Sequence, residues 1–431
     1  MKILLINPPY STDCCAYDTG PYVHSPVPSF GLGYIASFLI SKGYNDLKWL
    51  ECPIYNLNIK DVVDEVKKNN YNFIGITSTS HTYPNALELA KEIKKVSPDS
   101  FIVFGGVHVS FDYNNTLKND FVDAVAIGEG EITTYELIKA IEKKQDLSAV
   151  KGIAYRQKGK IIVNESRPQL ENLDELPFPA RNLLPKNILK KSGASLLTSR
   201  GCPFNCIFCS SGKFWNRRVR YRSSQNVIKE LKEVIKYCDP KQFEFVDDTF
   251  TLDKKRTMEI CDMIKKENIK LSWSCNSRVD TIDEEMAKKL KWAGCKEIFF
   301  GVESVSQEVL NNSKKGITLE QIKNAIKFCK KQGLYVTLSF VLGLPGESKK
   351  TIKDLIEFIK KTEADEILVN PLIPLIGTEL YTSPEKYNIK FEKGNWKDYV
   401  VFIVDTPQLS KEELKESYMD IIAAILLKEK K

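Results

Sequence analysis

Short apolar segments alternate with amphipathic helical patterns along most of this 431-residue chain. The N-terminal segments that have the length of buried strands are 3–7, 47–50, 73–77, 101–104 and 124–127. Between two of them Ile59, Val62 and Val66 recur at helical spacing, and Asn58 is expected to cap that helix. The alternation predicts an α/β fold with a doubly wound parallel sheet in residues 1–145.

The loops after these strands repeat a pattern of glycine and polar residues. A parallel sheet binds its ligands at the carboxyl ends of its strands, and glycine lets the backbone come close to a ligand. The loops that carry the pattern are 8–10, 78–81, 105–108 and 128–131. Their recurrence after successive strands predicts a ligand site at this edge of the sheet.

A second strand–helix series occupies residues 194–384. It follows a connector at 146–193 that contains a hairpin signal around Lys158-Gly159 and then a proline-rich segment. The strands expected in this series are 195–198, 243–246, 271–275, 297–300, 336–342 and 366–369. Six strands are too few for an eight-stranded barrel, so the series predicts a (β/α)6 partial TIM barrel. Residues 385–431 are expected to form a helical extension.

Three cysteines, Cys202, Cys206 and Cys209, follow the first strand of this second series with the spacing Cys-x3-Cys-x2-Cys. Three thiolates can hold three irons of a four-iron cluster and leave the fourth iron open for a small molecule. Structural zinc needs four ligands, and the three histidines of the chain lie far away in sequence. The motif therefore predicts an enzyme whose chemistry belongs to an iron–sulfur cofactor.

Composition and charge limit the remaining possibilities. The net charge of +7 comes mostly from lysines on helical faces, which indicates solvated surfaces. The denser basic run at 217–222 follows the cysteine motif, so an anionic substrate, a nucleic acid, an electron donor or a structural role stays open for it. Neither a signal peptide nor an apolar run of spanning length is found, and the apolar run at 421–427 is interpreted as packed. We expect a cytoplasmic protein whose eleven cysteines are reduced.

The cysteine motif and the loops after later strands resemble those of the radical SAM superfamily. The resemblance implies a 4Fe–4S cluster on the three cysteines and S-adenosylmethionine bound at the open iron. Asp247-Asp248 stands where the family commonly has Gly-Gly-Glu, and Gly343–Glu347 follows the fifth strand. The residues implied to bind S-adenosylmethionine are Phe208, Asp247, Asp248, Arg278, Glu303 and Ser304.

The N-terminal domain resembles the cobalamin-binding domain that is fused to one branch of this superfamily. The implied cobalamin contacts are Tyr10, Ser78, Thr79, Gly105, Gly106, Val107, His108, Gly128, Glu129 and Gly130. Cobalamin mutases place Asp-x-His after the first strand, but here Asp13 is followed two places on by Cys15. A bound cobalamin would therefore lack that histidine ligand. The same absence permits a domain that has kept the fold and lost the cofactor.

We expect a cobalamin-dependent radical methyltransferase that acts on an unactivated carbon of a small-molecule, natural-product or lipid-like substrate. Its electron donor would be a protein such as flavodoxin or ferredoxin, and no stable nucleic-acid or membrane partner is expected. A cyclase or rearrangement enzyme, with or without cobalamin, is the main alternative. A methylthiotransferase is a weaker alternative. That family needs three more cysteines in its N-terminal domain, whereas here Cys14, Cys15 and Cys52 are followed by no cysteine until Cys202, and we find no C-terminal nucleic-acid-binding barrel. A non-enzymatic iron–sulfur module would not need the loops at Asp248 and Glu303.

Overall fold

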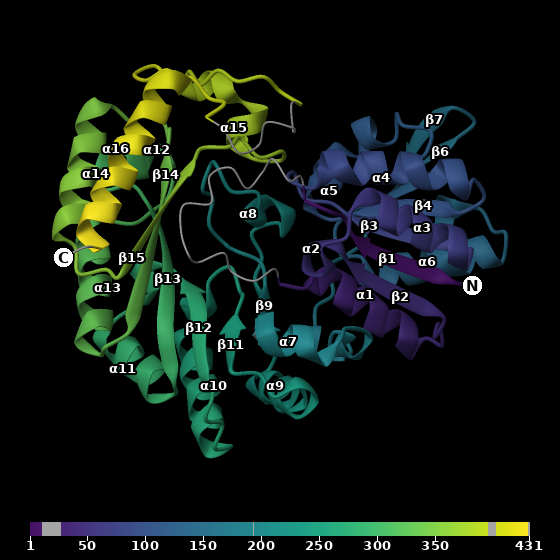
Figure 1. Cartoon of the computed structure of the whole chain (residues 1–431), viewed down its shortest axis with the longest axis horizontal. Helices are drawn as coiled ribbons and strands as arrows, with labels where there is room; N and C mark the ends of the chain where they lie inside the picture. Colours follow the sequence, from purple (N-terminus) through teal and green to yellow (C-terminus); the bar gives the residue numbers. More distant parts are fainter. Residues whose placement is uncertain (11–26, 193, 395–401, 430–431) are drawn as a thin grey trace. The chain divides into compact units, whose positions relative to one another are not determined.

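The computed structural model describes residues 1–10, 27–192, 194–394 and 402–429. The chain divides into two compact units, unit 1 (Met1–Ser192) and unit 2 (Gly193–Lys431). Both units are drawn in Figure 1.

Unit 1 is built on a seven-stranded sheet with the order β2-β1-β3-β4-β5-β6-β7. The pairs from β2 to β5 are parallel, whereas β6 runs antiparallel to β5 and to β7. The strands are β1 Ile3–Asn7, β2 Leu47–Glu51, β3 Phe73–Thr77, β4 Phe101–Gly105, β5 Ala124–Ala126, β6 Ile153–Gln157 and β7 Lys160–Val163. The helices are α1 Phe30–Ser41, α2 Cys52–Tyr55, α3 Ile59–Asn69, α4 Tyr83–Val96, α5 Val107–Thr116, α6 Glu131–Glu142 and α7 Lys186–Ser192, with short 3-10 turns η2 Leu147–Ala149, η3 Leu173–Glu175 and η4 Arg181–Leu183.

Local sequence explains these elements. In β1 the four residues from Ile3 to Ile6 are all buried, as expected for a central parallel strand covered on both faces. Helix α3 begins with a capping box in which Asn58 accepts from the backbone N–H of Asp61 and the Asp61 carboxylate accepts in return. The predicted doubly wound sheet and the predicted cap at Asn58 are confirmed.

The segment interpreted as a connector is part of unit 1. Its hairpin adds β6 and β7 to the sheet, where they cover the three-residue strand β5. Its proline-rich part packs on α1, because Ser37 Oγ donates to the carbonyl of Pro177 at 3.3 Å and Ala180 N donates to the carbonyl of Gly33 at 3.0 Å. A short apolar edge strand needs such a cover, and the sequence pattern did not reveal that requirement.

A buried carboxylate, Glu51, joins three elements of unit 1 at the carboxyl ends of β1 and β2. Its Oε2 accepts from Asn7 Nδ2, and its Oε1 accepts from Ser29 N and Trp49 Nε1, each at 2.7 Å. The side chain is fully buried, and this burial raises its pKa to about 7 even though the three hydrogen bonds act in the opposite direction. Glu51 thereby fixes the end of β1 relative to the start of α1.

Replacing Glu51 with glutamine should flatten the pH dependence of unit 1 stability. The carboxyl group titrates near 4.5 when exposed and near 7 when folded, so only the folded state keeps the proton between these values. Its contribution to stability is therefore present at low pH and is lost as pH rises from about 4.5 to about 7, by on the order of 1–3 kcal/mol. Hydrogen-exchange protection factors of the β2 peptide should show this loss in the wild type and not in the Glu51→Gln variant. Equal pH dependence in both proteins would contradict the assignment.

Unit 2 contains a six-stranded parallel sheet with the order β15-β14-β13-β12-β11-β8. The sheet curls with helices on its outer side, and β8 and β15 do not pair among the described residues (Figure 1). The strands are β8 Ala194–Leu196, β9 Ser199–Arg200, β10 Arg220–Tyr221, β11 Gln242–Phe245, β12 Ser272–Ser277, β13 Cys295–Glu303, β14 Tyr335–Leu342 and β15 Glu366–Pro371, of which β9 and β10 form a separate antiparallel pair. This is the predicted partial barrel.

The helices of unit 2 follow the strands in the predicted alternation. They are α8 Ser211–Phe214, α9 Ser224–Cys238, α10 Lys254–Lys266, α11 Glu284–Trp292, α12 Gln307–Asn312, α13 Leu319–Lys331, α14 Lys349–Lys361, α15 Glu379–Thr382 and α16 Lys411–Glu429, with 3-10 turns η5 Phe250–Leu252, η6 Val279–Thr281 and η7 Pro384–Tyr387. Strand β13 runs past the predicted end at residue 300, because a bulge between Gly301 and Glu303 lets Glu303 still pair with Phe340.

The outer layer of the barrel is closely packed. Phe243, Phe245, Phe250 and Trp273 form an aromatic group between the sheet and its helices, with ring centroids 4.3–6.0 Å apart. Five further cysteines of unit 2 are buried and form no disulfide bond within the described residues, namely Cys238, Cys261, Cys275, Cys295 and Cys329. Their thiols fill space in the interior of this unit.

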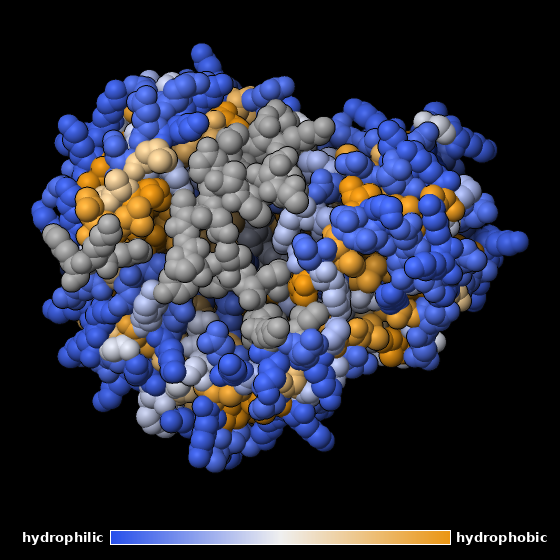
Figure 2. Space-filling model, viewed as in Figure 1, coloured by the Kyte–Doolittle hydropathy of each residue, from blue (hydrophilic) through white to orange (hydrophobic). Residues whose placement is uncertain are grey.

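The C-terminal helix α16 packs along α14. Its buried face includes Leu414 and Ile421, whereas Met419, Leu426 and Leu427 on the other face are exposed. Figure 2 shows an apolar area over this helix within a mostly hydrophilic surface. None of the described helices is long and apolar enough to cross a membrane.

Candidate functional site

The cysteine loop follows the short strand β9 and is held by backbone hydrogen bonds. Cys209 N donates to the carbonyl of Cys206 at 3.2 Å, and Ile207 N donates to the carbonyl of Ser313 at 3.1 Å. Cys202 and Cys206 are half-buried, and Cys209 is exposed. The three thiols thus belong to one compact turn that is fastened to the loop after α12.

Glycine is required at the start of this turn. Gly201 has φ +108°, and a Cβ atom there would lie only 2.0 Å from the carbonyl oxygen of Arg218. Gly212 packs in a similar way, because its Cβ would lie 2.4 Å from the carbonyl oxygen of Phe204. Because neither position has room for a side chain, the backbone of the cysteine loop packs directly against the backbone of the segment that follows it.

The electrostatics of the three cysteines suit a metal cluster. Desolvation by the surrounding protein raises the pKa of each thiol, to about 12 for Cys209 even though this residue is partly open to solvent, so the thiolates need a positive partner. Within the described ranges no three side chains of ligand type are close enough to share one metal ion. A 4Fe–4S cluster binds each thiolate at a different iron, so its ligands stand farther apart than those of a single ion. The residues present therefore fit the cluster.

Asp247, at the end of β11, is a structural residue. Its carboxylate is fully buried and accepts hydrogen bonds from Thr198 N, Thr198 Oγ1 and Ser199 Oγ. Burial raises its pKa, and the positive charge of Arg256 and these hydrogen bonds oppose the rise. The carboxylate thus joins β11 to the residues just before the cysteine loop. We expected Asp247 to bind S-adenosylmethionine, but its carboxylate is engaged in these hydrogen bonds within the protein.

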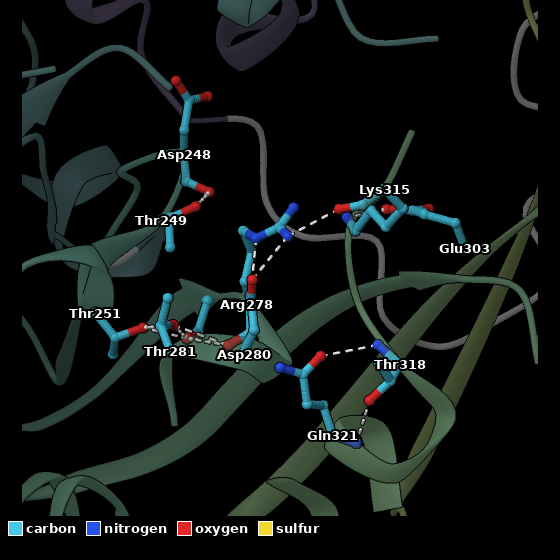
Figure 3. Close-up of polar contacts among 11 residues, drawn as sticks. Asp248, Thr249, Thr251, Arg278, Asp280, Thr281, Glu303, Lys315, Thr318 and Gln321 are labelled. Atoms are coloured by element: carbon cyan, nitrogen blue, oxygen red, sulfur yellow. Dashed lines mark hydrogen bonds and ion pairs between the residues drawn. The ribbon is translucent and has the colours of Figure 1, made fainter. Parts of the chain in front are cut away.

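Asp248 points the other way and is exposed, although surrounding protein raises the pKa of its carboxyl group. Its Oδ2 accepts from Ser211 Oγ at 2.6 Å, and Ser211 begins α8 directly after the cysteine loop. Figure 3 shows Asp248 apart from the Arg278 network, with its own carboxylate free of the contacts drawn there. It is an accessible anion beside the cysteines.

Arg278, Glu303 and Lys315 form a connected group of charges (Figure 3). Lys315 Nζ pairs with Glu303 Oε1 at 2.8 Å, and both side chains are buried. Arg278 pairs with Asp280 through two contacts of 2.9 Å and donates to the carbonyl of Lys315 at 2.9 Å. The motif predicted Arg278 and Glu303, but Lys315 and Asp280 carried no signal in a chain with so many lysines and acids.

The end of β13 is shaped to hold this group. Glu303 has φ +71°, which is uncommon for a residue with a side chain. A Cβ atom on Gly301 would lie 2.7 Å from Glu303 Oε1 and 3.2 Å from Lys315 Nζ, so the glycine makes room for the ion pair. Ser304, the next expected contact, is buried, and its Oγ accepts from Ser306 N at 3.1 Å. Ser304 therefore shapes the loop through its hydroxyl group.

Other expected residues occupy different positions around the barrel mouth. Phe208, next to Cys209, is half-buried and leaves part of its ring accessible. Glu347 is buried in the loop after β14, where it accepts from the N–H of Gly343, and its pKa is raised to about 7 by burial.

In the basic run, Arg220 and Arg222 are buried and Arg222 pairs with Glu230, so a structural role fits these two residues.

The carboxyl edge of the unit 1 sheet contains open positions. Tyr10 is 51% exposed, and Thr79 is exposed in the loop after β3. A Cβ atom at Gly105 or Gly128 would have nothing within 4 Å. Small residues at an accessible strand edge suit a bulky cofactor. The assignment of these four positions to a cobalamin pocket stays a prediction.

The remaining expected contacts serve the fold of this edge. A Cβ atom at Gly106, which has φ +100°, would lie 2.6 Å from the carbonyl oxygen of Ser78, so this glycine lets two loops of unit 1 meet. Ser78 is itself buried, Val107 is half-buried at the start of α5, Glu129 accepts from Leu170 N, and Gly130 contacts Ile35.

His108 is a core residue. It is fully buried, its Nδ1 lies 2.9 Å from Ser80 Oγ, and its ring stacks on Tyr83 with centroids 4.0 Å apart. Burial lowers its pKa to about 3, so it is neutral. His108 was expected to contact cobalamin, but the geometry fits an ordinary hydrogen-bonded histidine of the core. Cys14 and Cys15, in the loop after the first strand, lie outside the described residues.

Comparison with known proteins gives the chain a family. Residues 196–359 match the radical SAM superfamily, and residues 21–138 match the B12 binding domain. A relative from Pyrococcus horikoshii, named an uncharacterised methyltransferase, is 37% identical over 403 residues, which cover 93% of this chain and 86% of the relative. The chain therefore belongs to the radical SAM superfamily, in the branch that carries a B12 binding domain.

Two further likenesses describe this branch. The anaerobic magnesium-protoporphyrin IX monomethyl ester cyclase of Rubrivivax gelatinosus is 29% identical, with 85% of this chain and 66% of the cyclase covered. Among solved structures, the radical S-adenosylmethionine methyltransferase TsrM from Kitasatospora setae, with cobalamin and a 4Fe–4S cluster bound, superimposes with a TM-score of 0.78 at 16% identity, covering 99% of this chain and 89% of that chain. The predicted fold class, and a 4Fe–4S cluster, S-adenosylmethionine and cobalamin as cofactors, are confirmed by the family.

The two neighbouring aspartates should respond differently to the same substitution. Asp247→Asn loses a buried acceptor charge that several donors share, so we expect the unfolding free energy to fall by about 1–3 kcal/mol. Asp248→Asn removes an exposed charge and should leave stability within about 0.5 kcal/mol of the wild type while weakening S-adenosylmethionine binding about tenfold or more. Thermal unfolding of the metal-free protein and equilibrium dialysis of the reconstituted protein measure the two effects. Loss of stability in the Asp248 variant with binding unchanged would reverse the assignment.

Proposed function

We propose that this protein is a cobalamin-dependent radical S-adenosylmethionine methyltransferase that acts on an unactivated carbon of a small molecule. The observation that carries the proposal is the accessible three-cysteine loop of unit 2 with Asp248 and the Arg278–Lys315 cations beside it. Three protein thiolates leave one iron of a 4Fe–4S cluster open, which is the position where S-adenosylmethionine would bind.

The charges around the loop match the groups of S-adenosylmethionine. The exposed Asp248 carboxylate can accept hydrogen bonds from the ammonium group, and Arg278 with Lys315 offers two cations for the carboxylate. The partly accessible ring of Phe208 provides a surface for the adenine. The bound cofactor would supply a 5′-deoxyadenosyl radical that removes a hydrogen atom from the substrate. The protein contributes position and exclusion of water.

The open edge of unit 1 supports a methyl carrier. The residues that would line the corrin or its nucleotide tail are Gly105, Gly128, Thr79 and Tyr10. The sequence has Cys15, and not histidine, two places after Asp13. When bound, cobalamin supplies a cobalt atom that can carry a methyl group. Such a carrier is needed by a cobalamin-dependent methyltransferase, whereas an enzyme that does not use cobalamin has no need of it.

A cyclase or rearrangement enzyme is the second candidate, because a magnesium-protoporphyrin cyclase is among the relatives. Such an enzyme would use the same cluster and would transfer no methyl group. The electron needed for either reaction would come from a protein donor of the flavodoxin or ferredoxin class.

The products of S-adenosylmethionine decide between the two reactions. Anaerobically reconstituted protein with hydroxocobalamin and dithionite should form 5′-deoxyadenosine, because reductive cleavage of the sulfonium yields it. It should also form S-adenosylhomocysteine, because loss of the methyl group leaves this product. The variant with Cys202, Cys206 and Cys209 all changed to alanine should lose the iron–sulfur absorbance and 5′-deoxyadenosine together while staying folded.

Both products are measured by liquid chromatography with mass spectrometry. 5′-Deoxyadenosine without S-adenosylhomocysteine would replace methyl transfer by cyclisation or rearrangement. Absence of 5′-deoxyadenosine in a protein with an intact cluster would remove the radical mechanism altogether.

Cobalamin binding should depend on the space beside Gly105. Gly105→Leu places a side chain in the open region at the end of β4, so we expect at least tenfold weaker retention of hydroxocobalamin with full iron content. Asp99→Leu is the matched control, because Asp99 is exposed just before the other end of the same strand. Equilibrium dialysis and iron analysis measure both properties. If the wild-type protein retains no cobalamin at micromolar concentration, unit 1 has lost its cofactor and the methyltransferase proposal falls.

A further inference from the structure

Lys315 lies in a loop that turns its side chain inward. Lys314 has φ +53° and Gly316 has φ +71°, so the chain reverses on both sides of Lys315. The Lys315 side chain is 8% exposed and pairs with Glu303, whereas the Lys314 side chain is 44% exposed and pairs with Glu379 at 2.7 Å. Two adjacent lysines therefore differ in burial and in partner.

The loop that holds Lys315 is attached to the cysteine loop. Ser313, two residues before Lys315, is fully buried and accepts through its carbonyl from Ile207 N at 3.1 Å, next to Cys206. Arg278 connects to the same place from another strand end, since its guanidinium donates to the Lys315 carbonyl and stacks on Phe204 with 3.5 Å to the ring centroid. Two buried cations, Lys315 and Arg278, thus belong to the structure that packs against the segment between Cys202 and Cys206.

Each of the two cations has an acid beside it. Lys315 Nζ lies 2.8 Å from Glu303 Oε1, and Arg278 Nε lies 2.9 Å from Asp280 Oδ1. Removing one member of such a buried pair leaves the charge of the other uncompensated.

We infer that the Lys315–Glu303 pair sets the reduction potential of the iron–sulfur cluster, with Lys315 as the residue that favours the reduced state. The inference rests on the proposed function, because it requires a cluster on Cys202, Cys206 and Cys209. One-electron reduction adds a negative charge to the cluster and breaks no bond. A buried cation close to a cluster thiolate stabilises that added charge, because charges interact strongly in the low-dielectric interior. In this role Lys315 acts through its charge on the cluster, in addition to the cation that it would offer to the carboxylate of S-adenosylmethionine.

The two partners should shift the potential in opposite directions. Lys315→Met removes the cation and leaves the carboxylate, so we expect a lower midpoint potential than in the wild type. Glu303→Gln removes the anion and leaves the cation, so we expect a higher one. Lys315→Arg keeps the charge and should stay near the wild type, as should the double variant with Lys315→Met and Glu303→Gln. Lys314→Met is the matched control, because it removes a neighbouring lysine charge that is exposed, and its potential should not change.

The measurement is a dithionite titration of the anaerobically reconstituted proteins, followed by electron paramagnetic resonance of the reduced cluster without S-adenosylmethionine. Dithionite supplies the electron, so neither substrate nor a protein donor is needed. Shifts of the same sign in the two single variants, or a Lys315→Met shift no larger than that of Lys314→Met, would overturn the inference. Should Lys315→Met fail to fold, the rise in Glu303→Gln and the constancy of Lys315→Arg still decide it.

The outcomes separate this inference from the proposed function. A wild-type protein that takes up the cluster but forms no 5′-deoxyadenosine would refute the function, and the titration would still test Lys315. A protein that forms 5′-deoxyadenosine with potentials unaffected by Lys315 would refute only the inference. A wild-type protein that takes up no iron would refute both.

Discussion

The catalytic half of this protein depends on one buried carboxylate. Asp247 ends β11 and accepts from Thr198 and Ser199, which immediately precede the cysteine loop. Arg256 reaches the same point, since its guanidinium donates to the carbonyls of Thr198 and Arg222. Burying a carboxylate is costly unless donors replace its water, and here three donors do so. These hydrogen bonds join the end of β11 to the residues just before the cysteine loop, and they thereby hold the loop next to Asp248.

The order and type of the strands could be predicted because parallel strands are buried on both faces and leave an apolar signature in the sequence. The cysteine ligands could be predicted because their spacing is local. The roles of Asp247 and Asp248 could not be separated, since neighbouring residues at a strand end point in opposite directions and the sequence does not say which one faces the core. Lys315 was missed because its connection to Arg278 spans 37 residues and ordinary lysines surround it in the sequence.

Glycine has two different structural roles in unit 1, and the sequence alone could not distinguish them. Gly105 leaves open space at the sheet edge, whereas Gly106 is needed because the Ser78 backbone lies against it. The proline-rich segment before unit 2 posed a similar problem. Its composition is typical of a linker, yet it packs on α1 because Gly33 leaves just enough room for Trp49 and Pro179. In both cases the deciding contact comes from a part of the chain that is distant in sequence.

The contact between Gly201 and Arg218 has a consequence for substitutions near the three cysteines. The carbonyl of Arg218 fills the space beside Gly201, and Arg218 follows a turn in which Asn216 and Arg217 both have positive φ. The backbone of the cysteine turn therefore packs directly against the segment that follows it. A side chain at position 201 would displace this segment and change the course of the turn, although residue 201 is not itself one of the three thiols.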